Sequence, residues 1–312
     1  MAGAGTGGGG SARHAPTPGD DEPFVPGDAV ADVHAHTTRS DGVLTPAELV
    51  RQAYVAGVRL FAIADHDNLA GYRELVAPGA DPLPTDLTLV PATEINAVTR
   101  GLGLDLTEGE LHILGIGVDP ADEAFEAALA SQRGARRTRF FATVDRLRDI
   151  GLAIDAQVAT LDLTADDALG RPTVARALVA AGFAESVEDA FRRLLAHGQP
   201  GYVPRTGLGP VEAIRAIRAA GGLASLAHFW EAPDRVSLLR ELMGEGLDGL
   251  ESHHRSFDEV SRDRVSATAR ALGLVETGGT DYHGDTGPYA MAHAGLVMPD
   301  ALVAGLRARL GL

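Results

Sequence analysis

Histidines and carboxylates in this sequence gather at the ends of short apolar runs. His34 and His36 stand two residues apart in DVHAH, so their side chains point to the same face of a strand. Five more histidines lie in or directly after apolar runs: His66, His112, His228, His253 and His283. Acidic residues share these places, namely Asp41, Asp65, Asp67, Glu94, Glu251 and Asp281.

This combination of side chains predicts a site for divalent cations. Buried imidazoles and clustered carboxylates need partners, because unpaired polar groups are costly and like charges repel. Imidazole suits Zn²⁺, Mn²⁺ and Fe²⁺, and the chain has no cysteine, which excludes thiolate-bound zinc and iron–sulfur clusters. We expect two or three ions, and metals about 3.5–4 Å apart serve the in-line hydrolysis of phosphate esters.

The elements that must position these residues are short strands alternating with helices. Seven runs have the length and composition of buried strands: 29–36, 60–65, 87–93, 110–118, 222–228, 248–253 and 274–281. Between most of them lie helix patterns, as in 45–56, where Thr45 can cap, Pro46 opens the first turn and Glu48 stands at the capping-box position. The alternation predicts an α/β fold of parallel strands, a barrel one strand short of the (β/α)₈ type, whose C-terminal strand ends share one mouth.

Two segments fall outside the barrel pattern. Residues 1–26 are rich in Gly, Pro, Ala and Asp without a hydrophobic period, which predicts a disordered tail. Residues 119–207 show only helix patterns (121–150, 172–181 and 187–197), far more than a connection of 2–6 residues needs. We therefore expect a barrel domain over 27–118 and 208–312, with 119–207 as a helical insertion that covers its mouth as a lid.

Charge and hydropathy exclude several classes of partner. The formal net charge is −16, from 43 acidic and 27 basic residues, so stable binding to nucleic-acid backbones or anionic membranes is not expected. No run reaches the 18 or more apolar residues of a membrane span, and the start lacks the apolar core of a secretory signal. A cytoplasmic location is expected, and nothing here indicates an oligomeric state.

Six separated motifs resemble the PHP (polymerase and histidinol phosphatase) family in order and spacing: DVHAHTTRSDG, AIADHDN, ATEIN, LHILGIG, LASLAH and GGTDYHG. The resemblance runs from Asp32 to about Gly284 and implies a distorted (β/α)₇ barrel with three metals. It implies these ligands: His34, His36 and Asp281 for the first metal, Glu94 bridging to the second, His112 and His228 for the second, and Asp41, His66 and His283 for the third. Asp65 is expected to orient a ligand histidine from behind.

The insertion is expected to supply arginines for a phosphate group. The segment GRPTVARALVAAGF resembles the family segment with a phosphate-binding arginine, here Arg171, although Thr173 stands where the family often has histidine. Arg205, in GYVPRTG, is a second candidate. The run RGARRTR contains further arginines, which fit either a solvated helix face or a guide for phosphate.

The expected function is that of a metal-dependent phosphomonoesterase. The motifs look most like the branch that hydrolyses 3′,5′-nucleoside bisphosphates, AMP-like monophosphates or short RNA 5′ ends, with a hydroxide between two ions attacking phosphorus. Mn²⁺ is the favoured ion, with Fe²⁺, Zn²⁺ or Mg²⁺ as alternatives. The acid that protonates the leaving group stays open among Asp65, His254 and a metal-bound water. Alternatives are a histidinol-phosphate or cyclic-phosphodiester hydrolase, an amidohydrolase-type enzyme, or a catalytically silent scaffold.

Overall fold

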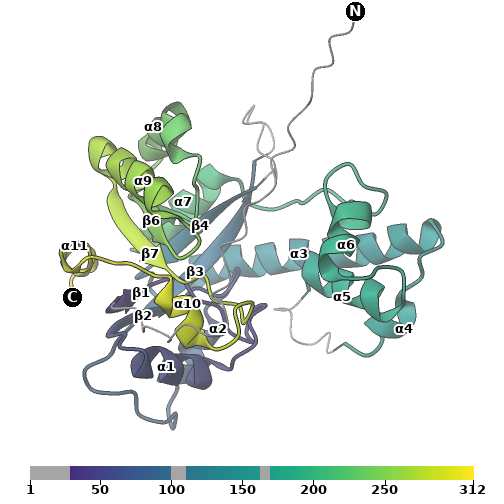
Figure 1. Ribbon diagram of the computed structural model, residues 1–312, viewed down its shortest axis with the longest axis horizontal. Coiled ribbons are helices and arrows are strands. Elements are labelled where there is room, and N and C mark those ends of the chain that lie inside the picture. Colours follow the sequence, from purple (N-terminus) through teal and green to yellow (C-terminus); the bar gives the residue numbers. More distant parts are fainter. Residues whose placement is uncertain (1–28, 100–109, 162–168) are drawn as a thin grey trace, which may run out of the picture.

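A barrel of seven strands forms the centre of the computed structural model, which describes residues 29–99, 110–161 and 169–312 (Figure 1). The strands are neighbours in chain order: β1 (Ala31–Asp32), β2 (Leu60–Ile63), β3 (Thr88–Val98), β4 (Glu110–Ile116), β5 (Leu223–Leu226), β6 (Gly249–His254) and β7 (Val275–Gly279). The ends of the sheet meet through Val33 N–H, which donates to Gly278 O at 3.2 Å, and through a parallel bridge between Ala35 and Tyr282. The expected α/β barrel is confirmed.

Strand β4 departs from the expected parallel arrangement. It runs antiparallel to both β3 and β5, whereas the other neighbouring pairs are parallel. Parallel strands need a crossover of a dozen or more residues, and the connection over 99–109 is too short for one. The prediction of parallel strands is therefore wrong for β4. Because β4 is reversed, its beginning lies at the rim where β3 ends, and Asn96 of β3 pairs with His112 of β4.

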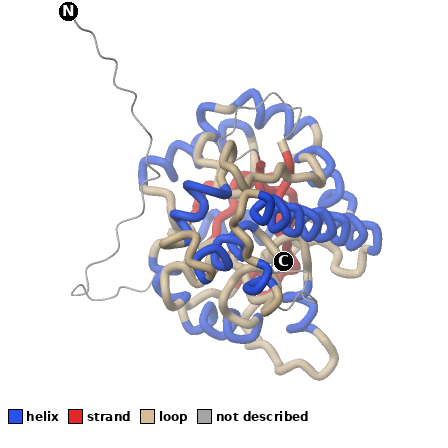
Figure 2. Tube along the Cα trace, turned by 90° about the vertical axis from the view of Figure 1, so that its right-hand side faces the viewer, coloured by secondary structure: helices blue, strands red, loops and turns tan. Residues whose placement is uncertain are grey.

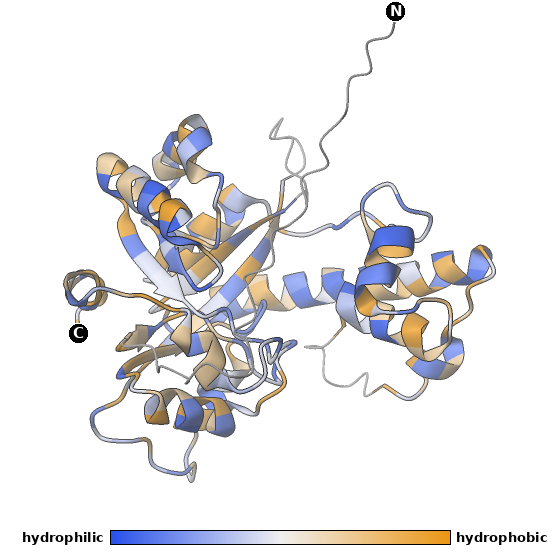
Figure 3. Ribbon diagram, viewed as in Figure 1, coloured by the Kyte–Doolittle hydropathy of each residue, from blue (hydrophilic) through white to orange (hydrophobic). Residues whose placement is uncertain are grey.

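Helices surround the strands, as Figure 2 shows. Those next to the barrel are α1 (Pro46–Val55), α2 (Ala70–Val76), α7 (Pro210–Ala219), η3 (Ala232–Asp234), α8 (Val236–Gly244), α9 (Glu259–Leu272), α10 (Tyr289–Ala294) and α11 (Asp300–Leu310). The capping box predicted for α1 is present: Thr45 Oγ1 accepts from Glu48 N–H, and the Glu48 carboxylate accepts from Thr45 N–H. In Figure 3 these helices alternate between apolar and polar residues, as helices packed on a barrel should.

The insertion consists of α3 (Glu123–Asp149), α4 (Asp155–Val158), α5 (Arg171–Ala180), α6 (Val187–Ala190) and the π-turn η2 (Phe191–Leu195). The long helix α3 leads from the barrel to the other insertion helices (Figure 1). Phe125 and Leu129, near its start, pack into the core around α7, whereas Phe140 and Leu147 join a separate apolar cluster with α5 and α6. One rigid helix thus connects the two cores, and the boundaries 119–207 stay a prediction.

Two further expectations concern the N-terminal tail and membrane-spanning helices. The predicted tail, residues 1–26, lies outside the described residues. Among the residues that are described, no helix combines the length and the apolar character needed to cross a bilayer.

Candidate active site

The side chains that the sequence singled out meet at one end of the barrel. They form three groups in which one nitrogen or oxygen of each residue lies within 4.8 Å of the others: His34, His36, Glu94 and Asp281; Glu94, His112 and His228; and His36, Asp41, His66 and His283. All nine expected metal ligands are therefore brought together. The structure also places His36 in the third group as well as the first, because its two ring nitrogens face different neighbours.

Glu94 lies at the centre of these groups and is 1% exposed. Its Oε2 is 3.3 Å from His34 Nε2, 3.2 Å from His36 Nε2 and 3.0 Å from His66 Nδ1. Its Oε1 is 2.8 Å from His112 Nδ1 and 3.1 Å from His228 Nε2. Burial alone would raise the pKa of Glu94, but the neighbouring His112, His34 and His66 hold that pKa well below its usual value. The carboxylate is ionised and touches both of the groups that it was expected to bridge.

Several buried polar atoms at this end of the barrel have no hydrogen-bond partner within the described part of the chain. They are His34 Nε2, His36 Nε2, Asp41 Oδ1, Glu94 Oε2 and His254 Nε2. An unsatisfied buried polar group costs about 1–3 kcal/mol, so five at one place call for a shared partner. Nitrogen and oxygen donors in small groups are the ligand set of divalent cations such as Mn²⁺, Fe²⁺ and Zn²⁺. The residues present fit such ions.

Glu251 orients two of the histidines, a role the sequence did not reveal. Its Oε1 is 3.0 Å from His34 Nδ1, and its Oε2 accepts from the backbone N–H of His228 at 2.7 Å. A carboxylate at Nδ1 fixes the tautomer and leaves Nε2 free to bind a metal. Glu251 is fully buried in β6, and its position at a strand end was the only signal in the sequence.

Asp65, the residue expected to orient a histidine, supports a loop instead. Its Oδ1 accepts from Thr37 N–H and from Ser40 Oγ, both at 2.7 Å, and its Oδ2 accepts from Thr37 Oγ1 at 2.8 Å. Its side chain connects to His36 through Ser40, whose Oγ is 3.4 Å from His36 Nδ1. The sequence expected Asp65 to orient a ligand histidine from behind; its carboxylate oxygens are engaged by the turn that follows His36 and connect to that ring through Ser40.

Three residues at this end of the barrel have left-handed backbone conformations: Asp67, His228 and Asp281, with φ of 54°, 30° and 47°. They are the only such non-glycine residues in the described ranges. Each costs of order 1–3 kcal/mol and persists only where its surroundings fix it. Asp281 N–H donates to His34 O at 2.6 Å, and Asp67 N–H donates to Glu94 O at 3.0 Å, so the strain is tied to the candidate ligands.

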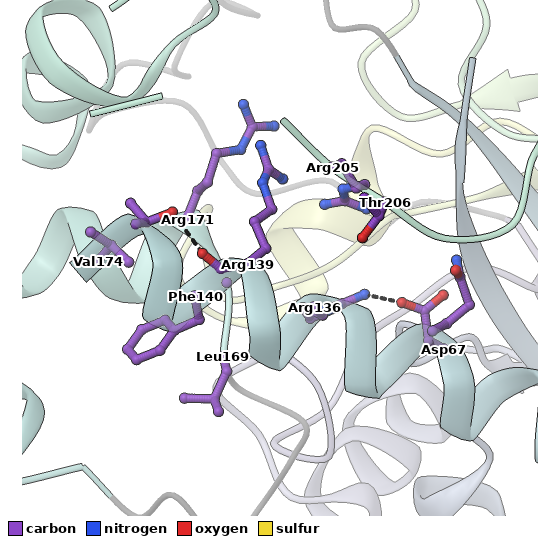
Figure 4. Close-up of a pocket in the computed structure, with 12 residues that line it drawn as sticks. Asp67, Arg136, Arg139, Phe140, Leu169, Arg171, Val174, Arg205 and Thr206 are labelled. Carbon is purple, nitrogen blue, oxygen red and sulfur yellow. Dashed lines mark hydrogen bonds and ion pairs between the residues drawn. The ribbon is translucent and has the colours of Figure 1, made fainter. Parts of the chain in front are cut away.

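An open cavity of about 610 Å³ connects the histidines to the insertion. One side carries Asp41, His66 and His112 from the groups above, with Asn96 beside them. The other side carries Arg136, Arg171 and Arg205 together with Thr173 and Phe191. A second cavity of about 420 Å³ shares the three arginines and adds Arg139 and an apolar wall of Phe140, Leu169 and Val174 (Figure 4).

Positive charge exceeds negative charge around this cavity. Arg171 Nη2 is 3.0 Å from Glu110 Oε1, and Arg205 Nε is 2.9 Å from Glu110 Oε2. Arg136 pairs with Asp67, as the dashed line in Figure 4 shows. Burial, and then the neighbouring Arg171 and Arg205, lower the pKa of Arg139 to about 10. Four arginines thus face three carboxylates (Asp41, Asp67 and Glu110), and the excess of positive charge favours an anion.

The sequence named Arg171 and Arg205 as substrate-binding candidates, and both line the cavity. Arg136 and Arg139 come from the RGARRTR run and face the same space, so the solvated-face interpretation is wrong for these two. Glu110, which holds two arginines, was not found because nothing in its local sequence indicates a pairing across β4 and the insertion.

His254, a candidate proton donor, lies beside the first group and is 7% exposed. Its Nε2 is 3.5 Å from Asp281 Oδ2, and its ring centroid is 5.7 Å from that of His228. The backbone N–H of Ser256 donates to His254 Nδ1 at 3.3 Å. Ser256 Oγ lies 2.6 Å from the same nitrogen, and Nε2 is the ring atom that faces the carboxylate and the histidines.

Known proteins are similar to this sequence over most of its length. A 5′-3′ exoribonuclease from Haemophilus influenzae is 31% identical over 258 residues, which is 81% of this chain and 89% of that protein. A 3′,5′-nucleoside bisphosphate phosphatase from Chromobacterium violaceum is 30% identical over 263 residues, covering 81% of this chain and 86% of that protein. No family model matches the sequence.

A solved structure extends the likeness to three dimensions. A Bifidobacterium adolescentis protein assigned as a metal-dependent phosphoesterase has a TM-score of 0.70 and 33% identity, covering 89% of this chain and 96% of that one. These matches span the barrel and the insertion together. With its histidine and carboxylate groups at the barrel rim, the chain belongs to the PHP (polymerase and histidinol phosphatase) family of metal-dependent phosphoesterases.

Proposed function

We propose that this phosphoesterase removes a phosphate group from a small nucleotide: a 3′,5′-nucleoside bisphosphate, an AMP-like monophosphate or the 5′ end of a short RNA. The observation that carries the proposal is the single cavity that joins candidate metal ligands to three arginines. Phosphoryl transfer needs cations on both sides of the phosphate, and this cavity offers both. The names of the Haemophilus and Chromobacterium relatives support a nucleotide or an RNA end as the substrate.

The nine candidate ligands would hold two or three divalent ions, with Mn²⁺ favoured. When bound, such ions lower the pKa of water and neutralise phosphate oxygens, which makes in-line attack possible at neutral pH. Glu94 would hold ions of two groups at a fixed spacing, because its two oxygens face different histidines. Glu251 would keep His34 in the tautomer that can act as a ligand.

His254 is the side chain best placed to protonate the leaving group. Its Nε2 is buried beside Asp281 without a hydrogen bond in the described residues, and the doubly protonated ring would give up its proton from that atom. Asp65 does not fit this role, because its oxygens are engaged by Thr37 and Ser40. A general acid of this kind contributes typically 10²–10⁴-fold to the rate.

Arg171 and Arg205 would bind the phosphate from the insertion side. Glu110 holds both guanidinium groups at the cavity. Arginine forks match the geometry of phosphate oxygens better than a point charge does.

A phosphate-release assay tests the proposal. The kcat/KM of the protein supplied with Mn²⁺ is measured for five substrates: a nucleoside 3′,5′-bisphosphate, AMP, a 5′-phosphorylated dinucleotide, a cyclic phosphodiester and histidinol phosphate. We expect one of the first three to give the highest kcat/KM. Arg171→Ala and Arg205→Ala should raise KM about tenfold or more with unchanged metal content, whereas Arg215→Ala, on the exposed side of α7, should have no effect. Preference for histidinol phosphate, or unchanged kinetics in both arginine variants, would refute it.

A further inference from the structure

Asp32 is a fully buried carboxylate that belongs to none of the three ligand groups. It is the last residue of β1, and its Oδ1 accepts from the backbone N–H of His34 at 3.1 Å and from that of Thr280 at 3.0 Å. Its Oδ2 accepts from Thr280 Oγ1 and from the phenol of Tyr289 on α10, both at 2.7 Å. Burial raises the pKa of Asp32, and the hydrogen bonds from these three residues oppose the rise.

The two segments that Asp32 joins are the edges at which the barrel closes. β1 is the first strand of the sheet and β7 is the last, and we call the line where they meet the seam. Gly279 allows the close approach of the two edges, because a Cβ there would lie 2.3 Å from His34 Cβ and 2.9 Å from Asp32 Oδ1. The carboxylate of Asp32 therefore holds together two chain segments that pass each other without room for a side chain between them.

The first group of candidate ligands takes residues from both sides of this seam. His34 follows β1 and Asp281 follows β7, and His34 Nε2 is 3.2 Å from Asp281 Oδ1. Asp281 has the left-handed backbone described above, which persists only where its surroundings fix it. Thr280, which Asp32 binds through both its N–H and its hydroxyl, is the residue directly before Asp281. One carboxylate thus fixes the backbone at two candidate ligands.

We propose that Asp32 is a positioning residue that sets the spacing between His34 and Asp281 and thereby shapes the site of the first ion. This inference rests on the proposed function, of which it uses only the metal site. Asp32 acts through hydrogen bonds to the backbone, and an amide oxygen could accept from the same two N–H groups. A residue that only stabilised the barrel would leave the ion affinity of the folded protein unchanged.

The test measures Zn²⁺ affinity by chelator competition, at a temperature at which circular dichroism shows each variant to be folded. For Asp32→Ala we expect the affinity to fall about 10–100-fold, the usual effect of removing a group that orients metal ligands. Asp32→Asn keeps an oxygen for the two backbone N–H groups, and its NH₂ can donate to both hydroxyls, so it should restore most of the affinity. Leu239→Ala, in the apolar cluster around α7 and α8, is the matched control, because it destabilises the barrel away from the seam and should bind zinc as the wild type does.

Three results would overturn the proposal: wild-type affinity in Asp32→Ala, an equal loss in Asp32→Asn, which would assign the effect to charge, or an equal loss in Leu239→Ala, which would assign it to general destabilisation. Should Asp32→Ala fail to fold, Thr280→Val replaces it.

Thr280→Val removes the hydroxyl donor to Asp32 Oδ2 with little change of shape, and it should lower zinc affinity several-fold; unchanged affinity would also overturn the proposal. The measurements use no substrate, so an error in the nucleotide assignment leaves them unaffected. A wild-type protein that bound no zinc would instead refute the metal site of the proposed function.

Discussion

Replacing Glu94 by glutamine tests the role of the carboxylate that two of the three groups share. The substitution keeps the shape of the side chain but removes its charge and one anionic oxygen, in a position that contacts five imidazoles. If Glu94 fixes the spacing of two ions around the reacting phosphate, its charge supplies several kcal/mol of barrier lowering. A loss of about 3–5 kcal/mol corresponds to a fall of about 10²–10⁴-fold in kcat/KM, at 1.36 kcal/mol for each factor of ten.

Folding should be affected far less than catalysis. The apolar clusters of the barrel do not include Glu94, and glutamine can still accept and donate hydrogen bonds to the surrounding rings. In the metal-free protein, the loss is that of hydrogen bonds to a charged group, about 1.5–3 kcal/mol. For a chain of this size that lowers the unfolding midpoint by less than about 10 °C.

Three measurements decide the matter: kcat/KM on the best substrate, metal content, and the thermal midpoint after EDTA treatment. Glu241→Gln, which makes the same chemical change on the exposed face of α8, is the matched control and should behave as wild type. Near-normal turnover by Glu94→Gln would show that the carboxylate does not hold the ions. A variant that fails to fold without metal would show that its role is structural.

Three further perturbations probe the surroundings of the site. Glu251→Gln should weaken Zn²⁺ affinity about 10–100-fold in a chelator competition, because His34 loses the carboxylate at Nδ1; unchanged affinity would contradict the orienting role. EDTA treatment should abolish hydrolysis and lower the thermal midpoint, and Mn²⁺ should restore both; full activity in EDTA would overturn the metal assignment. Burial raises the pKa of Glu126, but hydrogen bonds from Arg133 and Arg73 lower it further, so that the pKa lies below its usual 4.5. These pairs therefore stabilise the fold above pH 4.5, and the stabilisation is lost as the pH falls through the lowered pKa. Urea unfolding of Glu126→Gln should show a deficit of about 1 kcal/mol or less at pH 7 that shrinks below pH 4.5; a constant deficit would show that the charge is not responsible.

The sequence predicted which histidines and carboxylates gather at the rim, because its signals are local. His34 and His36 share a face by the two-residue period of a strand, and His66 and Asp281 follow apolar runs that end at the same rim. His112 lies at the rim for a different reason from the one expected. It was expected at a C-terminal strand end, yet it stands near the start of β4 and reaches the rim because that strand is reversed.

Pairings across elements could not be predicted in the same way. The turn after His36 engages Asp65, and Glu251 on β6 takes the orienting role, although both carboxylates stand at strand ends in the sequence. Which strand end faces which histidine depends on the closed barrel, not on the motif. The arginines show the same limit: Arg136 and Arg139 share a helix with Arg137, and only the packing of α3 against the barrel turns two of them to the cavity.

The strained residues and the unsatisfied atoms coincide, and that coincidence argues for cations more strongly than either observation alone. Left-handed Asp281 and His228 are themselves candidate ligands, and left-handed Asp67 holds Arg136 at the cavity. Each conformation costs of order 1–3 kcal/mol, and each orphaned buried atom adds about as much. A fold optimised for stability alone would lose these features, since glycine relieves the backbone and apolar residues replace the unpaired atoms. Their concentration at one rim indicates that ion binding offsets the cost, so the loaded protein should be the more stable form.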